Sequence, residues 1–518
     1  MNDAWPTVAD LTRRLAPVFG CRIAAVEGGR QVSYAALGER ALRLGNGLRA
    51  IGLRPGDRVA QLADNSISVL EAYLGVPSAG LVLLPLNTRL AAAEIRSILE
   101  DAGCRALIAG PGFEDRAAEA ARDDVTLIGV ARQLGPRGYE DLIGLGRPNL
   151  AADPQPGDLG YLYYTSGTTG RPKGVKLSHS NVMAGALGAV AACGIGGGDT
   201  WLHAGPMFHL ADAFAIWGLT WLGGHHVCER FAPEAAVEAV LRERVTHTLM
   251  VPTAAQLFAD AASATQTRLD GLRALYFGGA PMPAPIFDHV RDHLAAALVP
   301  TYGMTETSGL ISSGFPGQTP EAEAPGAAVT TVGREGPLLA LDLVDDAGAP
   351  VEPGEVGEVR VRGPQVTSGY LNRPEETAAA LRNGWLHTGD MGRRSGDGSL
   401  SLVDRKKDMI ISGGENVYPR EVEVALERHP GILEAAVIGR PDSKWGESVC
   451  AYVRLRDGAE MSLETARVFA REHLAGYKLP RALTVVGDFP RTASGKVAKA
   501  SLRVAEDTHT SAERQDGT

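Results

Sequence analysis

Short apolar runs alternate with amphipathic stretches through the first part of the chain. Helical periodicity covers residues 34–52, and apolar runs follow at 58–63 and 81–86. The alternation resumes later, where apolar runs at 247–252 and 274–279 lie between helical stretches. Alternating strands and helices are typical of sheets whose strands run parallel. The pattern therefore predicts an α/β fold.

The pattern changes in the later part of the chain. Residues 331–403 carry short strand-like runs separated by Gly and Pro, which predicts a small β-rich subdomain. The stretch beyond it mixes helical and strand-like segments and predicts a separate α+β domain. We therefore divide the chain into an N-terminal domain (1–405), a C-terminal domain (406–510) and a disordered polar tail (511–518).

Composition supports a globular protein with more than one domain. The chain has 518 residues, 44% of them hydrophobic, and this length exceeds what one compact core accommodates. Its five cysteines are scattered without a C-x-x-C pair, which argues against a disulfide framework and a zinc site. Neither a signal peptide nor a long apolar run is visible. We therefore expect a cytoplasmic protein without a membrane span.

Charge argues against one class of partner. The formal net charge of −10 opposes general attraction to nucleic acid, so local cations must hold any anionic cofactor. The pair His225-His226 suggests a metal site. Adjacent residues on a strand point to opposite faces, however, so a structural role is favoured over metal binding.

Residues 164–175, YTSGTTGRPKGV, combine hydroxyls, glycines and cations in one loop. Such donors and turns can surround an anion, and Lys173 adds positive charge. The apolar run before the loop predicts a strand, and the stretch after Ser180 predicts a helix, so the loop lies at a strand end, where ligands of α/β sheets bind. A Walker-type loop is excluded because Gly174 follows the lysine in place of Ser or Thr. The loop therefore predicts a polyphosphate site.

Six further motifs accompany this loop in a fixed order. They are PMFH at 206–209, YFGGAPM at 276–282, YGMTE at 302–306, HTGD at 387–390, DRKKDMIISGGENVYP at 404–419 and PRTASGK at 490–496. Together with the loop they resemble the motifs of the adenylate-forming superfamily, which includes acyl-CoA synthetases, peptide-synthetase adenylation domains and luciferases.

The resemblance implies a fold and a reaction. The expected fold has a large N-terminal domain of α/β subdomains with a small β-barrel-like subdomain, followed by a small mobile α+β domain. The expected enzyme is an acyl-CoA synthetase that uses ATP, Mg²⁺ and coenzyme A. The carboxylate of a small acid attacks the α-phosphate and expels pyrophosphate, and donors and cations stabilise the charge that develops. The resulting acyl-AMP then passes its acyl group to coenzyme A. A homodimer is compatible with this expectation.

The resemblance also implies which residues bind ATP. They are Thr165, Ser166, Gly167, Thr168, Thr169, Gly170 and Lys173 in the phosphate loop; Gly278, Gly279, Ala280, Tyr302, Gly303 and Met304 around the purine; and Asp390 and Arg405 at the ribose.

Four residues are expected to take part in catalysis. Glu306 resembles the magnesium ligand, and one carboxylate is enough because Mg²⁺ keeps phosphate and water oxygens as its other ligands. Thr305 resembles the phosphate-binding threonine. Lys496 resembles the adenylation lysine, which bridges the carboxylate and the α-phosphate. His209 resembles the ring that closes the passage between acyl pocket and adenylate, and a core histidine is the alternative.

The second half-reaction requires the C-terminal domain to rotate. Lys407 occupies the hinge position of the family. Gly413 and Gly414 resemble the glycines that line the pantetheine tunnel. Trp445 and Lys478 are weaker candidates for the nucleotide end of coenzyme A, and a core Trp and a solvated Lys are the alternatives.

The acyl pocket is the least determined part of the site. Its candidates are His209, Ala213, Phe214, Gly303, Ser308 and Gly309, and ordinary core packing is the alternative for the helical ones. Small residues here indicate a bulky or medium-length acid, aromatic or polycyclic. Three other functions stay open: a stand-alone adenylating enzyme that loads an acyl carrier protein, a luciferase-type oxygenase and a non-catalytic binding module.

Overall fold

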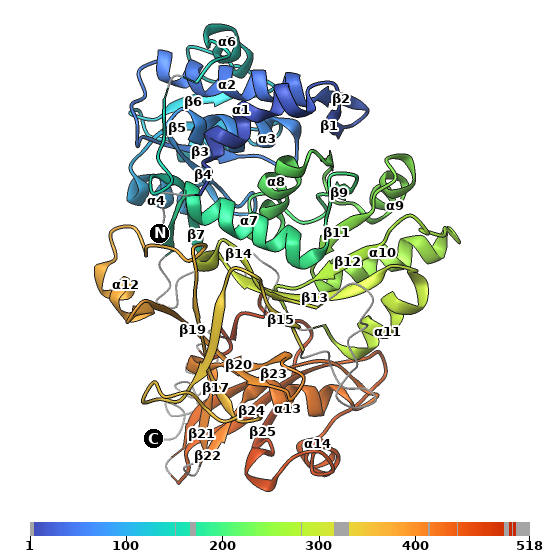
Figure 1. Cartoon of the computed structure of the whole chain (residues 1–518). Coiled ribbons are helices and arrows are strands. Elements are labelled where there is room, and N and C mark those ends of the chain that lie inside the picture. The colour runs from blue at the N-terminus through green and yellow to red at the C-terminus, as the bar shows by residue number, and fades with distance from the viewer. Residues whose placement is uncertain are drawn as a thin grey trace.

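The structure is a computed structural model. It describes residues 5–150, 152–165, 172–280, 282–314, 331–412, 415–442, 444–491, 497–499 and 501–503. Two sheets and their helices form a large upper body, and the C-terminal strands form a separate unit below it (Figure 1). Among the described helices, none is long and apolar enough to cross a membrane.

A six-stranded sheet forms the first half of the upper body. Its strand order is β6-β5-β3-β4-β7-β8, and every pairing is parallel except that of β7 with β8. This confirms the predicted α/β class. Its strands are β3 (Arg58–Leu62), β4 (Val82–Pro85), β5 (Cys104–Ala109), β6 (Thr126–Gly129), β7 (Leu159–Thr165) and β8 (Lys173–Ser178), and the helices of this half are α1 (Val8–Phe19), α2 (Tyr34–Ala50), α3 (Ile67–Ser78), α4 (Ala92–Ala102), α5 (Glu114–Ala120) and α6 (Tyr139–Leu145).

A nine-stranded sheet forms the second half. Its order is β15-β14-β13-β12-β11-β9-β10-β1-β2, so the N-terminal hairpin β1-β2 joins a sheet built mostly from later residues. Its strands are β1 (Ile23–Glu27), β2 (Arg30–Ser33), β9 (Thr200–Leu202), β10 (His225–Val227), β11 (His247–Met250), β12 (Ala274–Phe277), β13 (Ala297–Met304), β14 (Gly309–Ser313) and β15 (Arg334–Glu335), and its helices are α7 (His179–Cys193), α8 (Leu210–Leu222), α9 (Pro233–Arg242), α10 (Pro252–Ala264) and α11 (Ala284–His293).

Helices α7 and α8 pack against each other between the two sheets (Figure 1). Helix α7 begins where Ser178 caps the backbone N–H of Asn181, and it ends at Gly194 with φ of 66°. Helix α8 is mostly apolar and buried because it contributes to both cores: Trp217 packs with the six-stranded sheet and Phe214 with the nine-stranded one. The two halves therefore pack against a common helix, which contributes to the core of each.

The later part of the chain forms two smaller sheets. The predicted β-rich region is a five-stranded antiparallel sheet, and a second five-stranded sheet with its helices forms the C-terminal unit. The first contains β16 (Ala340–Val344), β17 (Val356–Arg362), β18 (Leu381–Arg382), β19 (Trp385–Arg394), β20 (Leu400–Arg405) and the helix α12 (Pro374–Ala380). The second contains β21 (Ile410–Ser412), β22 (Glu415–Val417), β23 (Ile432–Asp442), β24 (Gly446–Leu455), β25 (Ala482–Val485), α13 (Pro419–Glu427) and α14 (Leu463–Ala470). The change of sheet falls between β20 and β21, although the domain limits stay a prediction, and the tail at 511–518 lies outside the described residues.

Candidate active site

The phosphate loop joins two antiparallel strands at the edge of the six-stranded sheet. Thr165 ends β7, Lys173 begins β8, and the two residues pair directly. The sequence prediction of a strand followed by a helix missed β8, because its six residues are bounded by no turn signal other than the loop itself. The predicted residues Ser166, Gly167, Thr168, Thr169 and Gly170 lie outside the described residues, as do Gly413, Gly414 and Lys496.

The YGMTE motif forms a tight turn between β13 and β14. A short 3₁₀ helix, η1 (Thr305–Thr307), leads to Ser308 with φ of 52° and Gly309 with φ of 110°. These two positive φ values reverse the chain, so that Met304 pairs with Gly309. A Cβ on Gly303 would lie 2.1 Å from the carbonyl oxygen of Gly309, so only glycine fits there. Gly303 therefore allows the two strands to approach, which is a different reason from the space for substrate that the sequence suggested.

The connecting segment 364–369 fixes this turn through hydrogen bonds. The Gln365 side chain donates to the carbonyls of Thr307 and Leu310 at 3.0 and 2.6 Å. The Ser308 hydroxyl donates to the Gln365 carbonyl at 2.9 Å. The backbone N–H of Thr367 donates to the Glu306 carbonyl at 2.8 Å. The carboxylate of Glu306 is thus held on a backbone that is bonded on both sides.

Glu306 lies beside a tyrosine that the sequence analysis missed. The Tyr370 hydroxyl donates to Glu306 Oε1 at 2.8 Å, and Lys173 Nζ lies 5.4 Å from the centre of the Tyr370 ring. Burial and the nearby Glu306 carboxylate raise the pKa of Tyr370 above its ordinary value, so the hydroxyl stays a donor. The sequence gives little sign of this role, since the surrounding run SGYLNRP contains no carboxylate that would indicate a metal site. The arrangement joins the predicted metal ligand to the phosphate loop.

The residues around Glu306 fit a magnesium ion. Its carboxylate is nearly buried, with 8% of the residue exposed, and supplies the hard oxygen that Mg²⁺ prefers. Within the described parts of the chain, no group of three His, Cys, Asp or Glu residues is placed to hold a metal. A single carboxylate suits an ion whose other ligands are phosphate oxygens and water.

The ribose candidates come together from three strands. Asp390 on β19 accepts a hydrogen bond from the Tyr302 hydroxyl at 2.6 Å and lies 2.5 Å from Nε of Arg405, its register partner on β20. Burial and the Asp390 carboxylate raise the pKa of Tyr302 well above its ordinary value. Tyr302 and Arg405 thus satisfy a buried carboxylate that could accept from two vicinal hydroxyls. Stacking of the Tyr302 ring on adenine stays a prediction.

The turn after β12 leaves backbone accessible next to this group. A Cβ on Gly278 would lie 2.4 Å from Thr301 Oγ1, so the turn packs tightly on β13. Gly279 has φ of 77°, is exposed, and a Cβ there would meet nothing closer than Val251 Cγ1 at 3.7 Å. The open backbone at Gly279, with Ala280 half-buried beside it, fits a flat ring such as a purine.

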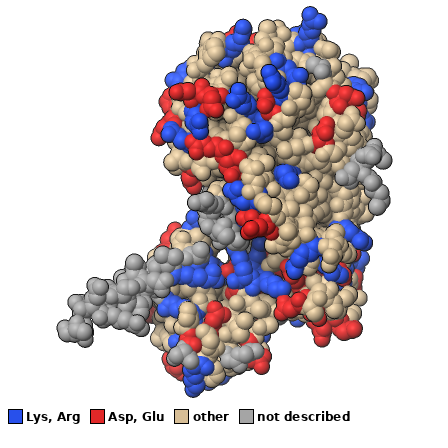
Figure 2. Space-filling view, turned by 90° about the vertical axis from the view of Figure 1, so that its left-hand side faces the viewer, with Lys and Arg blue, Asp and Glu red and all other residues tan. Residues whose placement is uncertain are grey.

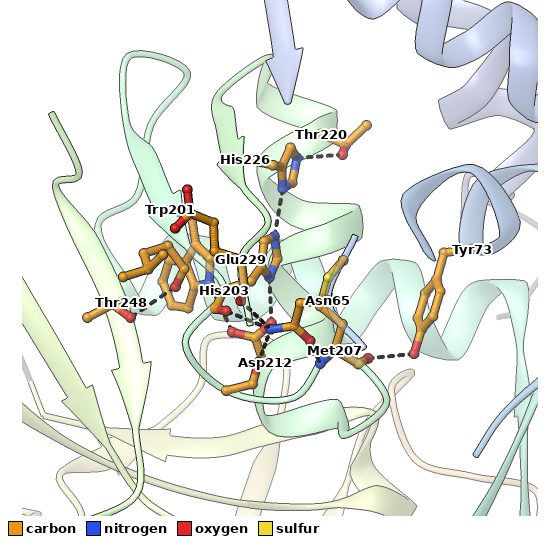
Figure 3. A network of polar contacts seen from close by, with 12 residues as sticks. Asn65, Tyr73, Trp201, His203, Met207, Asp212, Thr220, His226, Glu229 and Thr248 are labelled. Atoms are coloured by element: carbon orange, nitrogen blue, oxygen red, sulfur yellow. Dashed lines mark hydrogen bonds and ion pairs between the residues drawn. The ribbon is translucent and has the colours of Figure 1, made fainter. Parts of the chain in front are cut away.

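The PMFH segment is held by a network of polar contacts (Figure 3). Asp212 in the first turn of α8 accepts from Trp201 Nε1 at 3.1 Å and lies 2.5 Å from His203 Nδ1. His203 continues to His226 at 3.0 Å, and His226 to Thr220 Oγ1 at 2.9 Å. Burial, followed by the nearby His203, lowers the pKa of His226 well below its ordinary value. His226 therefore belongs to the interior, as the structural interpretation of the His pair expected.

The other pocket candidates lie mostly in packed surroundings. His209 occupies the N-cap position of α8, and its ring packs against Phe208, with the centroids 4.6 Å apart. Ala213 and Phe214 are buried, and Phe214 meets Trp201 edge-on. Ser308 is fully buried with its hydroxyl on Gln365. Their role in an acyl pocket stays a prediction.

The coenzyme A candidates lie on or near the C-terminal unit. Lys407 is exposed in the short 3₁₀ helix η2 (Lys406–Asp408) between the two small sheets. Trp445 is half-buried beside Arg481, whose Cζ lies 4.3 Å from the ring centre. Lys478 pairs with Glu421 at 2.6 Å, so its charge is partly neutralised. Lys and Arg side chains gather where the upper body meets the lower unit (Figure 2), which gives an acidic chain a local basic band.

The nearly buried carboxylate of Glu306 and the hydrogen-bonded carboxylate of Asp390, with Lys173 at the end of a hydroxyl-rich loop, form an arrangement that is typical of nucleotide-dependent enzymes. The chain matches the AMP-binding enzyme family over residues 13–371 and the C-terminal domain of AMP-binding enzymes over residues 421–496. It therefore belongs to the AMP-binding enzyme family, the adenylate-forming superfamily that its motifs resemble.

Individual relatives agree along nearly the whole chain. A feruloyl-CoA synthase of Amycolatopsis sp. is 39% identical over 495 residues, covering 92% of this chain and 94% of the relative. A fatty acid–[acyl-carrier-protein] ligase of Streptomyces coeruleorubidus is 34% identical, covering 92% of each. The o-succinylbenzoate CoA synthetase of Bacillus subtilis, solved with its acyl-adenylate intermediate, is 31% identical with a TM-score of 0.82, covering 95% of this chain and 97% of that one. The predicted fold class is thereby confirmed.

Proposed function

We propose that the chain is an acyl-CoA synthetase, which activates a carboxylic acid to acyl-AMP with ATP and then transfers the acyl group to coenzyme A. The observation that carries this proposal is the convergence of Glu306, Tyr370 and Lys173 at one end of the site and of Asp390, Tyr302 and Arg405 at the other. Relatives named as CoA ligases confirm the predicted enzyme class, an acid–thiol ligase, and with it the cofactors ATP, Mg²⁺ and coenzyme A.

Each residue has a distinct role in this proposal. Glu306 holds Mg²⁺, which neutralises charge on the phosphates when it is bound. Lys173 and Thr165 place two ends of the phosphate loop against the same phosphates. Asp390 accepts from the ribose hydroxyls, while Arg405 and Tyr302 hold its carboxylate in place. These fixed donors and charges need little reorganisation as the reaction proceeds.

The thioester step is proposed to follow rotation of the C-terminal unit about Lys407. This residue is exposed and lies between the last strand of one sheet and the first strand of the next. Rotation would withdraw Lys496 and bring Gly413 and Gly414 to the site, so that the thiol could enter. We place the enzyme in the cytoplasm, where ATP and coenzyme A are both present.

The proposed acid is aromatic or polycyclic. The relatives support this choice, since one is named for the feruloyl group and one for succinylbenzoate. A second candidate function is a stand-alone adenylating enzyme that loads a carrier protein, because a relative of similar coverage is named as such a ligase. Both functions share the first half-reaction and differ in the acceptor.

A panel of aromatic, polycyclic and medium-chain acids distinguishes them. With ATP, Mg²⁺ and free coenzyme A present, at least one aromatic acid should make the enzyme release AMP and consume the coenzyme A thiol in equal amounts. Release of AMP only with a phosphopantetheinylated carrier protein would support the second candidate instead. If no acid supports exchange of pyrophosphate into ATP, both are wrong. Lys496→Ala should lose this exchange while still converting a supplied acyl-AMP to thioester.

A further inference from the structure

We propose that Asn65 is a positioning residue for the segment 203–209, and that it fixes the backbone from which His209 controls access to the acyl-adenylate. The proposal rests on the proposed function for the role of His209. Asn65 lies between β3 and α3, more than one hundred residues from the segment in sequence. Its own sequence surroundings give no sign of this role.

The Asn65 amide contacts the segment on both sides of its turn. Nδ2 donates to the carbonyls of His203 at 2.6 Å and Gly205 at 2.8 Å, with Glu229 O further away at 3.5 Å. Oδ1 accepts from the backbone N–H of Met207 at 2.8 Å. One side chain therefore satisfies backbone groups at three positions of a loop that has no ladder of its own.

A second side chain completes the fixation at Met207. The Tyr73 hydroxyl donates to the Met207 carbonyl at 2.7 Å, so both backbone groups of Met207 are bonded to side chains of the six-stranded half (Figure 3). The beginning of the segment has a further contact, because the Asp212 carboxylate lies 2.5 Å from the His203 ring and also accepts from Trp201, two residues before it.

His209 itself is bonded through its backbone rather than held on a free loop. Its N–H donates to the Pro206 carbonyl at 2.9 Å, and its carbonyl accepts from the N–H of Ala213 at 3.0 Å. With the backbone fixed at both ends, opening and closing of the acyl passage occur by rotation of the His209 side chain and not by displacement of the loop. Loosening the backbone should therefore admit water to the adenylate and weaken acid binding, while ATP binding stays unchanged.

The test compares Asn65→Ala with Asn46→Ala in the full-length protein. Asn46 is a matched control, because its side-chain amide also donates to two backbone carbonyls, those of Arg147 and Asn149, both at 2.6 Å. Asn65→Ala should raise the KM for the acid about tenfold and raise pyrophosphate release per thioester several-fold, with the KM for ATP unchanged, since one lost set of buried hydrogen bonds corresponds to about that factor. Asn46→Ala should change neither the KM for the acid nor the pyrophosphate released per thioester.

A second measurement does not depend on activity. Amide hydrogen exchange of peptides covering 203–209 should become about tenfold faster in Asn65→Ala and stay unchanged in Asn46→Ala. Tyr73→Phe, which keeps the ring, should show the same changes at smaller size and serves if Asn65→Ala fails to fold. If exchange is faster in Asn65→Ala but the wild-type protein activates no acid, the positioning role of Asn65 stands and the proposed function is wrong. Equal exchange in the two Asn variants, or a parallel loss of kcat with unchanged KM and coupling, would overturn the positioning role.

Discussion

The Tyr370 hydroxyl donates a 2.8 Å hydrogen bond to Glu306 Oε1, although the two residues lie 64 positions apart. This contact joins the turn after β13 to the segment that pairs with β8, since Tyr370 also forms an isolated bridge with Val175. The carboxylate proposed to hold Mg²⁺ is therefore oriented by a residue anchored to the phosphate-loop hairpin.

Tyr370→Phe should weaken the use of magnesium. A hydrogen bond to a charged group contributes about 1.5–3 kcal/mol, so the Mg²⁺ concentration for half-maximal acid-dependent pyrophosphate release should rise about tenfold or more. The KM for the acid should stay the same. Tyr139→Phe is the control, because Tyr139 likewise donates to a carboxylate, that of Glu71 at 2.7 Å, in the first half of the body. A magnesium requirement that is unchanged, or changed equally in both variants, would contradict the assignment.

Asp390→Asn tests the ribose site. An amide offers one acceptor oxygen where the carboxylate offers two, so the KM for ATP should rise about tenfold. Discrimination between ATP and 2′-deoxy-ATP should shrink at the same time, because the group that reads the hydroxyl is weakened. Asp342→Asn is the matched control: Asp342 pairs with Arg360 at 2.6 Å in the same small sheet. If the variant keeps the wild-type preference for ATP, Asp390 does not bind the ribose.

The sequence predicted the parts of the site that lie within single motifs. Glu306 and Asp390 could be proposed as ligands because each is a carboxylate in a short run of characteristic residues, and their roles stay predictions. Tyr370, Gln365 and Asn65 could not, because their roles arise only when the chain brings distant segments together. A side chain that bonds to backbone carbonyls has no requirement on the residue types it contacts, so no local pattern marks it.

In the fold, too, local features could be predicted from the sequence and long-range pairings could not. Alternating apolar runs predicted the parallel strands, because a strand covered on both faces must be apolar at every position. The position of β1 beside β10 could not be predicted, since a pairing across about two hundred residues depends on the whole core and not on either strand. The hairpin β7-β8 was missed for a simpler reason: its loop was interpreted as leading into a helix.

Lys407→Pro tests the proposed hinge. Proline fixes φ near −65° and so restricts the change of backbone angle that rotation requires. Acid-dependent pyrophosphate release should stay within about twofold of wild type, while thioester formation from supplied acyl-AMP should fall about a hundredfold, the scale of a blocked conformational step. Lys407→Ala removes the same charge but leaves the backbone free, and it should keep both half-reactions. Equal thioester rates in the two variants would place the hinge elsewhere.

His179 gives the chain a defined sensitivity to acid. Its Nδ1 accepts from the backbone N–H of Val8 at 3.2 Å, which attaches α1 to α7, and 1% of the residue is exposed. Burial lowers the pKa of His179 from 6.5 to about 4. Between these values the unfolded chain binds a proton that the folded protein does not, so the free energy of unfolding decreases as the pH falls through this window.

His179→Gln should remove this part of the pH dependence. A displacement from 6.5 to about 4 corresponds to about 3 kcal/mol, so wild type should lose about that much more stability than the variant between pH 6.5 and 4. Urea unfolding followed by circular dichroism at a series of pH values measures the difference. Contributions of all other groups are common to both proteins and cancel in the comparison. His293→Gln, at an exposed position on α11, should follow the wild-type curve. Parallel curves for wild type and His179→Gln would mean that the ring is already protonated, or exposed, in the folded protein.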